Sequence, residues 1–440
     1  MWTYYPALLE QPVPRYTSYP TAAEFGDAIG PDEMCRALGS VGEHDRLSLY
    51  VHIPYCTEIC WYCGCNTGAA NRTERLNHYL EALDQEIALI AQRLGGRGQV
   101  NHIAFGGGSP NAIKPLDFVR LVDRLVTSFR AVKPVISLEL DPRGFTSDWA
   151  RVLALTGVGR VSLGVQTFSP DVQAAIGRVQ PTELIETCVA ALRDQGIDNI
   201  NFDLMYGLPG QDEAILLDTL AETVRLKATT VSLFGYAHVP HMIPRQRRID
   251  ATALPGLQER FDQAARGHEF LLAAGYVAVG FDHYALPESP LAQAQHNGTL
   301  RRNFQGFTAD PHDALIGIGA TAISSFPSLL VQNEKNTGRY RMLVSAGRFP
   351  ASRGITRSPD DQRRGAVIEQ ILCFGAADLS PLGDISGYRA RLALHEELGL
   401  IRWEGNRLLL APEARPYART VAVIFDRWRE VPTTQFSHAI

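Results

Sequence analysis

Three cysteines stand close together at positions 56, 60 and 63, with the spacing C-x3-C-x2-C. They follow the apolar run Leu47–Ile53, whose composition is typical of a β-strand. A [4Fe–4S] cluster contains four irons and usually binds four cysteine thiolates. Three thiolates on so short a loop therefore predict a cluster in which one iron has no protein ligand. That iron can bind another molecule, which indicates catalysis more than electron storage.

The motif alone leaves other roles open for these cysteines. Cys65 and His52 could complete a structural zinc site, although such sites usually have wider loops between their ligands. Buried, unreactive thiols are the remaining alternative. The other cysteines, Cys35, Cys188 and Cys373, are scattered and form no regular disulfide framework. This usage is typical of a reducing compartment, so we expect a cytoplasmic protein.

The composition is that of a globular protein with two or three domains. The chain has 440 residues, of which 45% are hydrophobic, and a formal net charge of -5. This charge gives no general attraction to nucleic acid or anionic lipid. No apolar run approaches the roughly 18 residues of a membrane helix, and the first residues do not resemble a signal peptide. We therefore expect no nucleic-acid or membrane partner, and we expect a monomer.

Strand-like and helix-like segments alternate from about residue 46 to 235, and these elements must position the cysteines. Strands are predicted at Leu47–Ile53, Val100–Phe105, Val135–Leu140, Arg160–Val165, Asn199–Met205 and Thr229–Phe234. Helices are predicted at Arg72–Leu94, Phe118–Phe129, Thr182–Gln195 and Glu213–Leu226. Repeated strand–helix units indicate an α/β fold, with a parallel sheet curled into a partial (β/α)6 barrel like part of a TIM barrel.

In such barrels the carboxyl ends of the strands carry the active site. That rule selects the cysteine loop, the turn Gly106–Pro110, Glu139, Gln166, Asp203 and the pair Ala237 and His238. Taken alone, each carboxylate is as readily a helix N-cap or a loop anchor, and the glycine run is as readily a tight turn. Their convergence on one mouth supports a site more strongly than any single residue.

The C-terminal part has a different pattern. Helices are predicted at Gly365–Phe374, Ser386–Leu398 and Ala414–Trp428, and a hairpin at Leu400–Trp403 and Leu408–Leu410. This arrangement resembles a winged-helix module, and without a basic excess we expect it to cover the barrel mouth rather than bind DNA. The expected division is an N-terminal arm at 1–45, a catalytic domain at 46–348 with its barrel core at about 46–235, and a mainly helical cover domain at 349–440.

At this point the motifs resemble the radical S-adenosylmethionine (SAM) superfamily, through the cysteine loop, its preceding strand and the GGGSP turn at 106–110. More narrowly, the chain resembles the family of oxygen-independent coproporphyrinogen III oxidases. The strings that carry this resemblance are PRYTSYPT at 14–21, YVHIPYC at 50–56, CGCN at 63–66, GVQ at 164–166, DLMYGLP at 203–209 and RNFQG at 302–306. The similarity extends from about residue 12 to the string QFS at 435–437.

The resemblance implies that Cys56, Cys60 and Cys63 hold a [4Fe–4S] cluster whose remaining iron binds SAM. One electron then cleaves SAM to methionine and a 5′-deoxyadenosyl radical. The family binds two SAM molecules per active site. The residues implied to line these sites are Tyr50, Tyr62, Gly107, Gly108, Ser109, Glu139, Gln166, Arg178, Asp203, Ala237 and Ile323, with Phe304 and Gln305 approaching the second. Tyr50 and Cys65 are implied in catalysis, Cys65 beside the second SAM or the substrate and not as a cluster ligand.

The implied substrate is coproporphyrinogen III, two of whose four propionates become vinyl groups, giving protoporphyrinogen IX in haem biosynthesis. The reaction also needs an electron donor and an electron acceptor, which the sequence does not identify. Candidates for binding the propionates are Arg15, Arg245, Arg301, Arg302 and Lys335. Two alternatives are a haem chaperone of the same superfamily and a radical SAM enzyme that modifies haem anaerobically. The strings PRYTSYPT and RNFQG favour the oxidase over the chaperone.

Two positions depart from the family pattern. Ser109 stands where threonine is usual, and it keeps the hydroxyl group. Gly235 stands where a larger polar residue is expected, which would widen that wall of the site.

Overall fold

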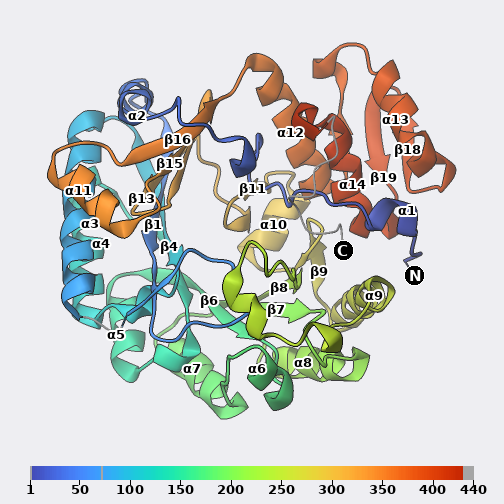
Figure 1. Ribbon diagram of the computed structural model, residues 1–440, viewed down its shortest axis with the longest axis horizontal. Coiled ribbons are helices and arrows are strands. Elements are labelled where there is room, and N and C mark those ends of the chain that lie inside the picture. Colours follow the sequence, from blue (N-terminus) through green and yellow to red (C-terminus); the bar gives the residue numbers. More distant parts are fainter. Residues whose placement is uncertain (1, 71–72, 430–440) are drawn as a thin grey trace.

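The computed structural model describes residues 2–70 and 73–429. The string QFS at 435–437 and residue 72, where the first predicted helix begins, lie outside the described residues. A curled sheet of 12 strands forms the centre of the molecule, in the order β16-β15-β14-β13-β1-β4-β5-β6-β7-β8-β10-β9. Figure 1 shows helices wrapped around the outside of this sheet, with the C-terminal helices gathered above one end.

The six predicted strands are present and parallel. They are β1 (Arg46–Ile53), β4 (Gln99–Gly107), β5 (Val135–Leu140), β6 (Val158–Gln166), β7 (Asn199–Tyr206) and β8 (Thr230–Gly235), each paired with the next. The helices between them are α3 (Thr73–Leu94), α4 (Pro115–Phe129), α5 (Ser147–Leu155), α6 (Pro170–Ala175), α7 (Thr182–Asp194) and α8 (Glu213–Arg225). The partial barrel is therefore confirmed, while α5 and α6 were not predicted.

The barrel strands alternate between apolar and polar residues because their two faces meet different surroundings. Along β5, Ile136, Leu138 and Leu140 are buried, whereas Ser137 and Glu139 between them are only partly buried. Successive side chains of a strand point to opposite faces, so the first set packs against the helices and the second faces the barrel interior. The same alternation places polar side chains of β6 and β7 in the interior, beside those of β5.

Further strands, most of them antiparallel to their neighbours, extend the six-stranded core at both edges. On one side β13 (Ala314–Ile318) runs parallel to β1 and leads to β14 (Ile323–Phe326), β15 (Leu329–Asn333) and β16 (Ala351–Thr356). On the other side β10 (His283–Ala285) and β9 (Val277–Val279) follow β8. The remaining elements of this part of the chain are α9 (Leu257–Ala273), α10 (Pro290–His296), the hairpin of β11 (Arg301–Asn303) and β12 (Gly306–Thr308), and α11 (Thr337–Ser345).

The C-terminal region contains α12 (Pro359–Phe374), β17 (Ala376–Asp378), α13 (Ser386–Glu397) and the predicted hairpin of β18 (Ile401–Glu404) and β19 (Arg407–Leu410). The predicted continuous helix Ala414–Trp428 was wrong. The chain forms a 3-10 segment at Pro412–Tyr417, the short helix α14 (Ala418–Ala422), and two more 3-10 turns at Val423–Phe425 and Arg427–Arg429. Pro416 cannot donate a backbone hydrogen bond, and Asp426 is extended and bonds the Tyr16 hydroxyl at 2.9 Å, so neither residue continues a helix.

The N-terminal arm, with α1 (Pro6–Leu9) and α2 (Pro31–Gly39), connects the barrel to the C-terminal region. Tyr16 and Tyr19 of the arm share a core with Ile371 of α12 and Val421 of α14. Figure 1 shows α1 lying beside α14 and β19. In the part of the chain that the structure describes, no helix is both long and apolar enough to cross a membrane.

Candidate active site

The cysteine loop leaves the carboxyl end of β1 and lies over the barrel mouth. Its first strand, β2 (Tyr55–Cys56), pairs with β3 (Gly68–Ala69), which closes the loop on itself. The Trp61 backbone N–H donates to the carbonyl of Ile176 at 3.0 Å, which ties the loop to the end of α6. Cys60 is buried, while Cys56 and Cys63 are half-buried. The loop is thus held at its base and near its middle, and Cys56, Cys60 and Cys63 are at least half-buried.

Two arginines contact the sulfur of Cys60. Arg143 and Arg178 each donate a hydrogen bond to the Cys60 Sγ at 3.3 Å. Both also pair with Asp141, at 2.7 Å and 3.2 Å. Nearby positive charge favours the thiolate, which is the form of cysteine that binds metal. The two arginines therefore place positive charge beside the Cys60 sulfur.

The cysteine thiols also influence one another. Burial, together with the nearby Cys63 and Cys60, raises the pKa of Cys56 to about 12. The Cys65 thiol and backbone N–H bond to Cys63, at 3.4 Å for the N–H, and this lowers the pKa of Cys63. Three mutually repelling thiolates gain stability from a cationic iron cluster, so the residues fit a [4Fe–4S] group with three protein ligands. Over residues 2–70 and 73–429, no three His, Cys, Asp or Glu side chains are arranged around a single metal ion.

A cavity of about 420 Å³ adjoins the three cysteines at the barrel mouth, and we call it the mouth cavity. It brings together residues from the ends of all six parallel strands or the loops that follow them. The predicted site residues that line it are Cys56, Cys60, Tyr62, Cys63, Cys65, Gly107, Gly108, Glu139, Gln166, Arg178, Asp203 and Ala237. Sequence positions more than 180 residues apart therefore form one site, as the barrel rule predicts.

The glycine turn at the end of β4 needs its glycines because a side chain and a neighbouring backbone segment lie directly against it. Gly107 has a φ of +116°, and a Cβ there would lie 2.7 Å from the His52 ring. A Cβ on Gly108 would lie 2.5 Å from the carbonyl oxygen of Tyr55. The Gly107 N–H donates to the Glu139 carboxylate at 3.3 Å. The turn is therefore packed directly beneath the cysteine loop and presents only backbone to the cavity.

Two carboxyl groups face the mouth cavity from β5 and β7. Asp203 accepts hydrogen bonds from the Ser162 hydroxyl and the Asn201 amide, both at 2.8 Å. Burial raises the pKa of Glu139 to about 7, and the negative charge of Asp203 contributes to the rise. Two neighbouring, half-buried carboxyl groups favour a ligand that brings positive charge and hydrogen-bond donors.

Gln166 ends β6 in an unusual backbone conformation. Its φ is +68°, although it is not a glycine, and the register between β6 and β7 shifts at Gly164 and Gln166. Such strained positions and bulges are common where a side chain is directed into a functional site. Gln166 is 8% exposed and lines the mouth cavity.

Three of the residues implied to line the SAM sites do not line the mouth cavity. Tyr50 is buried on β1, where its hydroxyl bonds His52 at 3.0 Å and its ring meets Phe304 edge-on at 4.5 Å. Ser109 bonds Asn111 and accepts from the Asp141 N–H at 3.3 Å, so it anchors the glycine turn to the loop after β5. Ile323 lies with Phe304 in a separate cavity of about 400 Å³ between the sheet edge and α12. Their proposed roles toward SAM stay predictions.

Sequence reasoning missed residues that support the site. Asp141 and Arg143 follow β5, so the barrel rule could have selected them. No pattern in the sequence pointed to Gln246, because it lies in a 3-10 segment (Pro244–Arg248) that belongs to no barrel strand. Its side-chain amide donates to the carbonyls of Tyr62 and Ala237, at 2.9 Å and 3.1 Å. It thereby joins the cysteine loop to the segment after β8.

Comparisons with known proteins agree with this geometry. The model of the radical SAM superfamily matches residues 50–222. The chain is similar to an oxygen-independent coproporphyrinogen III oxidase from Bradyrhizobium diazoefficiens, with 41% identity over 95% of each chain. It is 37% identical to the enzyme of that name from Pseudomonas aeruginosa, over 94% of this chain and 93% of the relative. Among solved structures it is similar to the coproporphyrinogen III oxidase of Escherichia coli, a radical SAM enzyme, with a TM-score of 0.90, 34% identity, and coverage of 94% of this chain and 97% of the other.

Proposed function

Because the chain belongs to the family of oxygen-independent coproporphyrinogen III oxidases within the radical SAM superfamily, we propose that it carries out this family's reaction in haem biosynthesis. A hydrogen atom leaves the β-carbon of a propionate of coproporphyrinogen III. The side chain then releases CO2 and passes one electron to an acceptor, which leaves a vinyl group. Two propionates react in this way, and the product is protoporphyrinogen IX.

The observation that carries this proposal is the convergence of three cysteines and the buried Arg178 on one cavity. When bound, a [4Fe–4S] cluster on Cys56, Cys60 and Cys63 supplies, together with SAM, the 5′-deoxyadenosyl radical that abstracts hydrogen. Arg143 and Arg178 keep positive charge at the Cys60 sulfur. We expect the walls of the barrel to keep water from the reacting centre.

The other lining residues suit a ligand with a sulfonium, an ammonium, a carboxylate and ribose hydroxyls. Glu139 and Asp203 can accept hydrogen bonds from the ammonium and the hydroxyls. Gln166 can do the same through its amide oxygen. The guanidinium of Arg178 suits the carboxylate, although in this structure it also donates to the carbonyl of Gly164 at 2.6 Å.

We also propose that two SAM molecules bind per active site. In support, the mouth cavity adjoins a second cavity of about 230 Å³ inside the barrel, and Glu139, Ser162, Asp203 and Phe234 line both. Gln305 lines the inner cavity, as its predicted approach to the second molecule requires. Cys65 would lie beside the second SAM or the substrate rather than bind iron.

Further proposals concern the setting of the reaction. We propose a cytoplasmic monomer that takes electrons from a separate donor, passes them to a separate acceptor, and binds neither nucleic acid nor membrane. The net charge of -5 supports the last point. We keep the division into arm, catalytic domain and cover domain as a proposal, and note that β16 lies beyond residue 348 and still belongs to the large sheet.

Anaerobic reconstitution tests the function directly. The protein is loaded with iron and sulfide, its iron is counted, and it is given SAM, a reductant and coproporphyrinogen III. We expect CO2, 5′-deoxyadenosine and vinyl products in the proportions that the reaction requires. Cleavage of SAM without vinyl formation would contradict the oxidase, and tight haem binding without turnover would point to the chaperone.

A further inference from the structure

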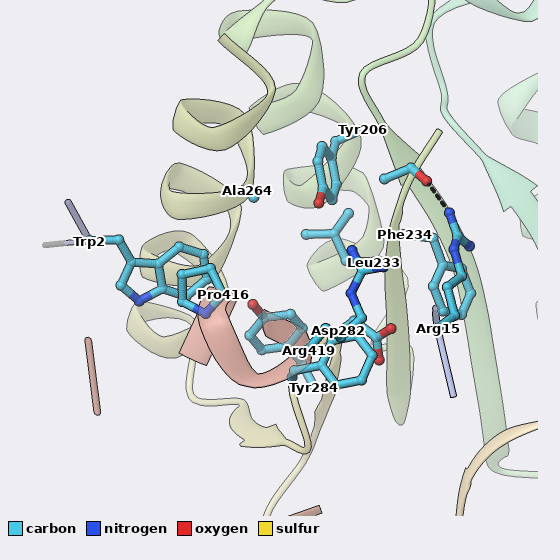
Figure 2. Close-up of a pocket in the computed structure, with 12 residues that line it drawn as sticks. Trp2, Arg15, Tyr206, Leu233, Phe234, Ala264, Asp282, Tyr284, Pro416 and Arg419 are labelled. Carbon is cyan, nitrogen blue, oxygen red and sulfur yellow. Dashed lines mark hydrogen bonds between the residues drawn. The ribbon is translucent and has the colours of Figure 1, made fainter. Parts of the chain in front are cut away.

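Another, smaller cavity lies beside the mouth cavity, and residues from distant parts of the chain line it. It has a volume of about 60 Å³, and we call it the side pocket. Figure 2 shows Tyr206, Asp282 and Arg419 around it, with Arg15 at one side. Arg15 comes from the N-terminal arm, Tyr206 from β7, Asp282 from the turn before β10, and Arg419 from α14.

The side pocket adjoins the proposed reaction site. Arg15, Phe234 and Gly235 line both the side pocket and the mouth cavity. The Arg15 guanidinium donates to the carbonyl of Gly235 at 2.8 Å, which places its charge at the boundary between the two cavities (Figure 2). A ligand in the mouth cavity could therefore extend one arm into the side pocket.

Gly235 keeps this boundary thin. A Cβ there would lie 2.9 Å from the Tyr206 hydroxyl oxygen and 3.2 Å from a terminal nitrogen of Arg260. Any larger residue, such as the polar one expected from the family pattern, would displace one of these groups. The departure at Gly235 thus lets Tyr206 and Arg260 approach the wall that the two cavities share.

Positive charge is concentrated around the side pocket. Arg15 and Arg419 line it, and Asp282 is the only carboxylate among its described lining residues. Three further arginines pack around it. Arg302 lies over the Phe281 ring at 4.7 Å, Arg415 lies over the Tyr284 ring at 5.4 Å, and Arg260 donates to the Tyr236 carbonyl at 2.7 Å.

Three of these arginines, Arg260, Arg302 and Arg415, are incompletely hydrogen-bonded among the described residues. The Nε atoms of Arg260 and Arg415 and the Nη1 of Arg302 are buried without a hydrogen-bond partner among the described residues. Burial, together with the charge of Arg15, lowers the pKa of Arg419 to about 10. Burying positive charge is unfavourable, so an anion that entered the side pocket would be stabilised by the arginines that line and surround it.

We propose that the side pocket binds a propionate carboxylate of the tetrapyrrole while its macrocycle stays in the mouth cavity. This inference rests on the proposed function, which supplies a substrate with four carboxylates, two of which do not react. The pocket is too small for a macrocycle, but a carboxylate fits between Arg15 and Arg419 and can form charge-assisted hydrogen bonds with both. A propionate held in this way would orient another one toward the reaction centre.

The other sequence-based candidates fit this role less well. Arg301 pairs with Glu369 at 2.9 Å, and Arg245 donates to the Thr67 hydroxyl at 3.0 Å. Arg302 supports the side pocket from outside its lining. Of the candidates, Arg15 alone lines both cavities.

The test uses the cluster-reconstituted protein and coproporphyrin III, a fluorescent analogue that binds without turnover. The variants are Arg15→Gln on the exposed arm, and Arg419→Met and Arg419→Lys at the buried position. Arg151→Gln on the surface of α5 is the charge-matched control. We expect Arg15→Gln and Arg419→Met to weaken coproporphyrin III binding about tenfold or more, since each removes a charge-assisted hydrogen bond. Arg419→Lys should recover much of the affinity, and Arg151→Gln should bind like the unaltered protein.

A second ligand separates charge recognition from folding. Coproporphyrin III tetramethyl ester has the same macrocycle without the carboxylates, and its affinity should be equal in all variants. If Arg15→Gln and Arg419→Met change only the melting temperature and leave coproporphyrin III binding intact, the arginines are structural and the inference is overturned. It is also overturned if both variants lose the ester as strongly as the acid. Failure of the unaltered enzyme to form vinyl groups would instead overturn the proposed function, because the binding comparison does not depend on turnover.

Discussion

Replacing Asp141 by Asn tests the buried ion network beneath the cysteine loop. Asp141 is 15% exposed and pairs with Arg143 and Arg178, which are 9% and 7% exposed. Asn keeps the shape and can still accept from the Arg143 backbone N–H, as Asp141 does at 3.0 Å. The substitution therefore removes mainly the charge. Among the described residues it leaves Arg178 without a carboxylate partner, and Arg143 keeps only Glu58, at 2.8 Å.

The size of the effect follows from burial. Removing one partner of a buried ion pair costs about 3–5 kcal/mol, and because Asn still accepts one hydrogen bond we expect about 3 kcal/mol. Asp360 provides a matched control, since it also pairs with two arginines, Arg363 and Arg364, but is 36% exposed. Exposed pairs contribute about 1 kcal/mol or less, so Asp360→Asn should change stability little.

Urea unfolding of the metal-free protein measures this difference. Asp141→Asn should unfold at a clearly lower urea concentration than Asp360→Asn and the unaltered protein. After reconstitution it should also retain less iron, because Arg178 and Arg143 would no longer be held against the Cys60 sulfur. Equal unfolding midpoints for the two variants would refute the argument from burial, and normal iron content would refute the link to the cysteine loop.

Cys60→Ser should abolish the visible absorption of the cluster and all SAM cleavage, since it removes the buried sulfur among the three ligands. SAM should bind more tightly as the pH rises through about 7, because Glu139 is protonated below its raised pKa of about 7 and anionic above it. Glu139→Gln should flatten that pH dependence and weaken SAM binding above pH 7, as measured by equilibrium dialysis. Gly235→Ser should raise the KM for coproporphyrinogen III with little change in SAM affinity, because its Cβ would displace Tyr206 or Arg260.

Each of these three predictions can be contradicted by a specific result. SAM cleavage by Cys60→Ser would remove the cluster assignment. A pH dependence of SAM binding that persists in Glu139→Gln would assign the titration to another group. An unchanged KM in Gly235→Ser would show that the wall between the two cavities does not influence the substrate.

Much of the fold could be predicted because it depends on local patterns. Alternating polar and apolar residues along Val135–Leu140 identify a strand with one face inside the barrel, and this alone directs Glu139 inward. The apolar spacing in Thr182–Asp194 identifies a helix on the outside. Short, polar-interrupted elements such as α5 and the broken segment at Ala414–Trp428 were missed or misread, because periodicity over so few residues is weak and Pro416 ends the helical pattern.

The cysteine triad, the six parallel strands and the strand ends that converge on the mouth could all be predicted from the sequence. Spacing and periodicity are local properties, and the rule that strand ends share one face needs no knowledge of loops. Two contacts are seen only in the folded chain. Asp141 pairs with the two arginines that contact Cys60. Arg15 and Arg419, 404 positions apart, line one pocket. Such contacts between single polar side chains leave no periodic pattern in the sequence, since they form only when the arm and the C-terminal region pack against the completed barrel.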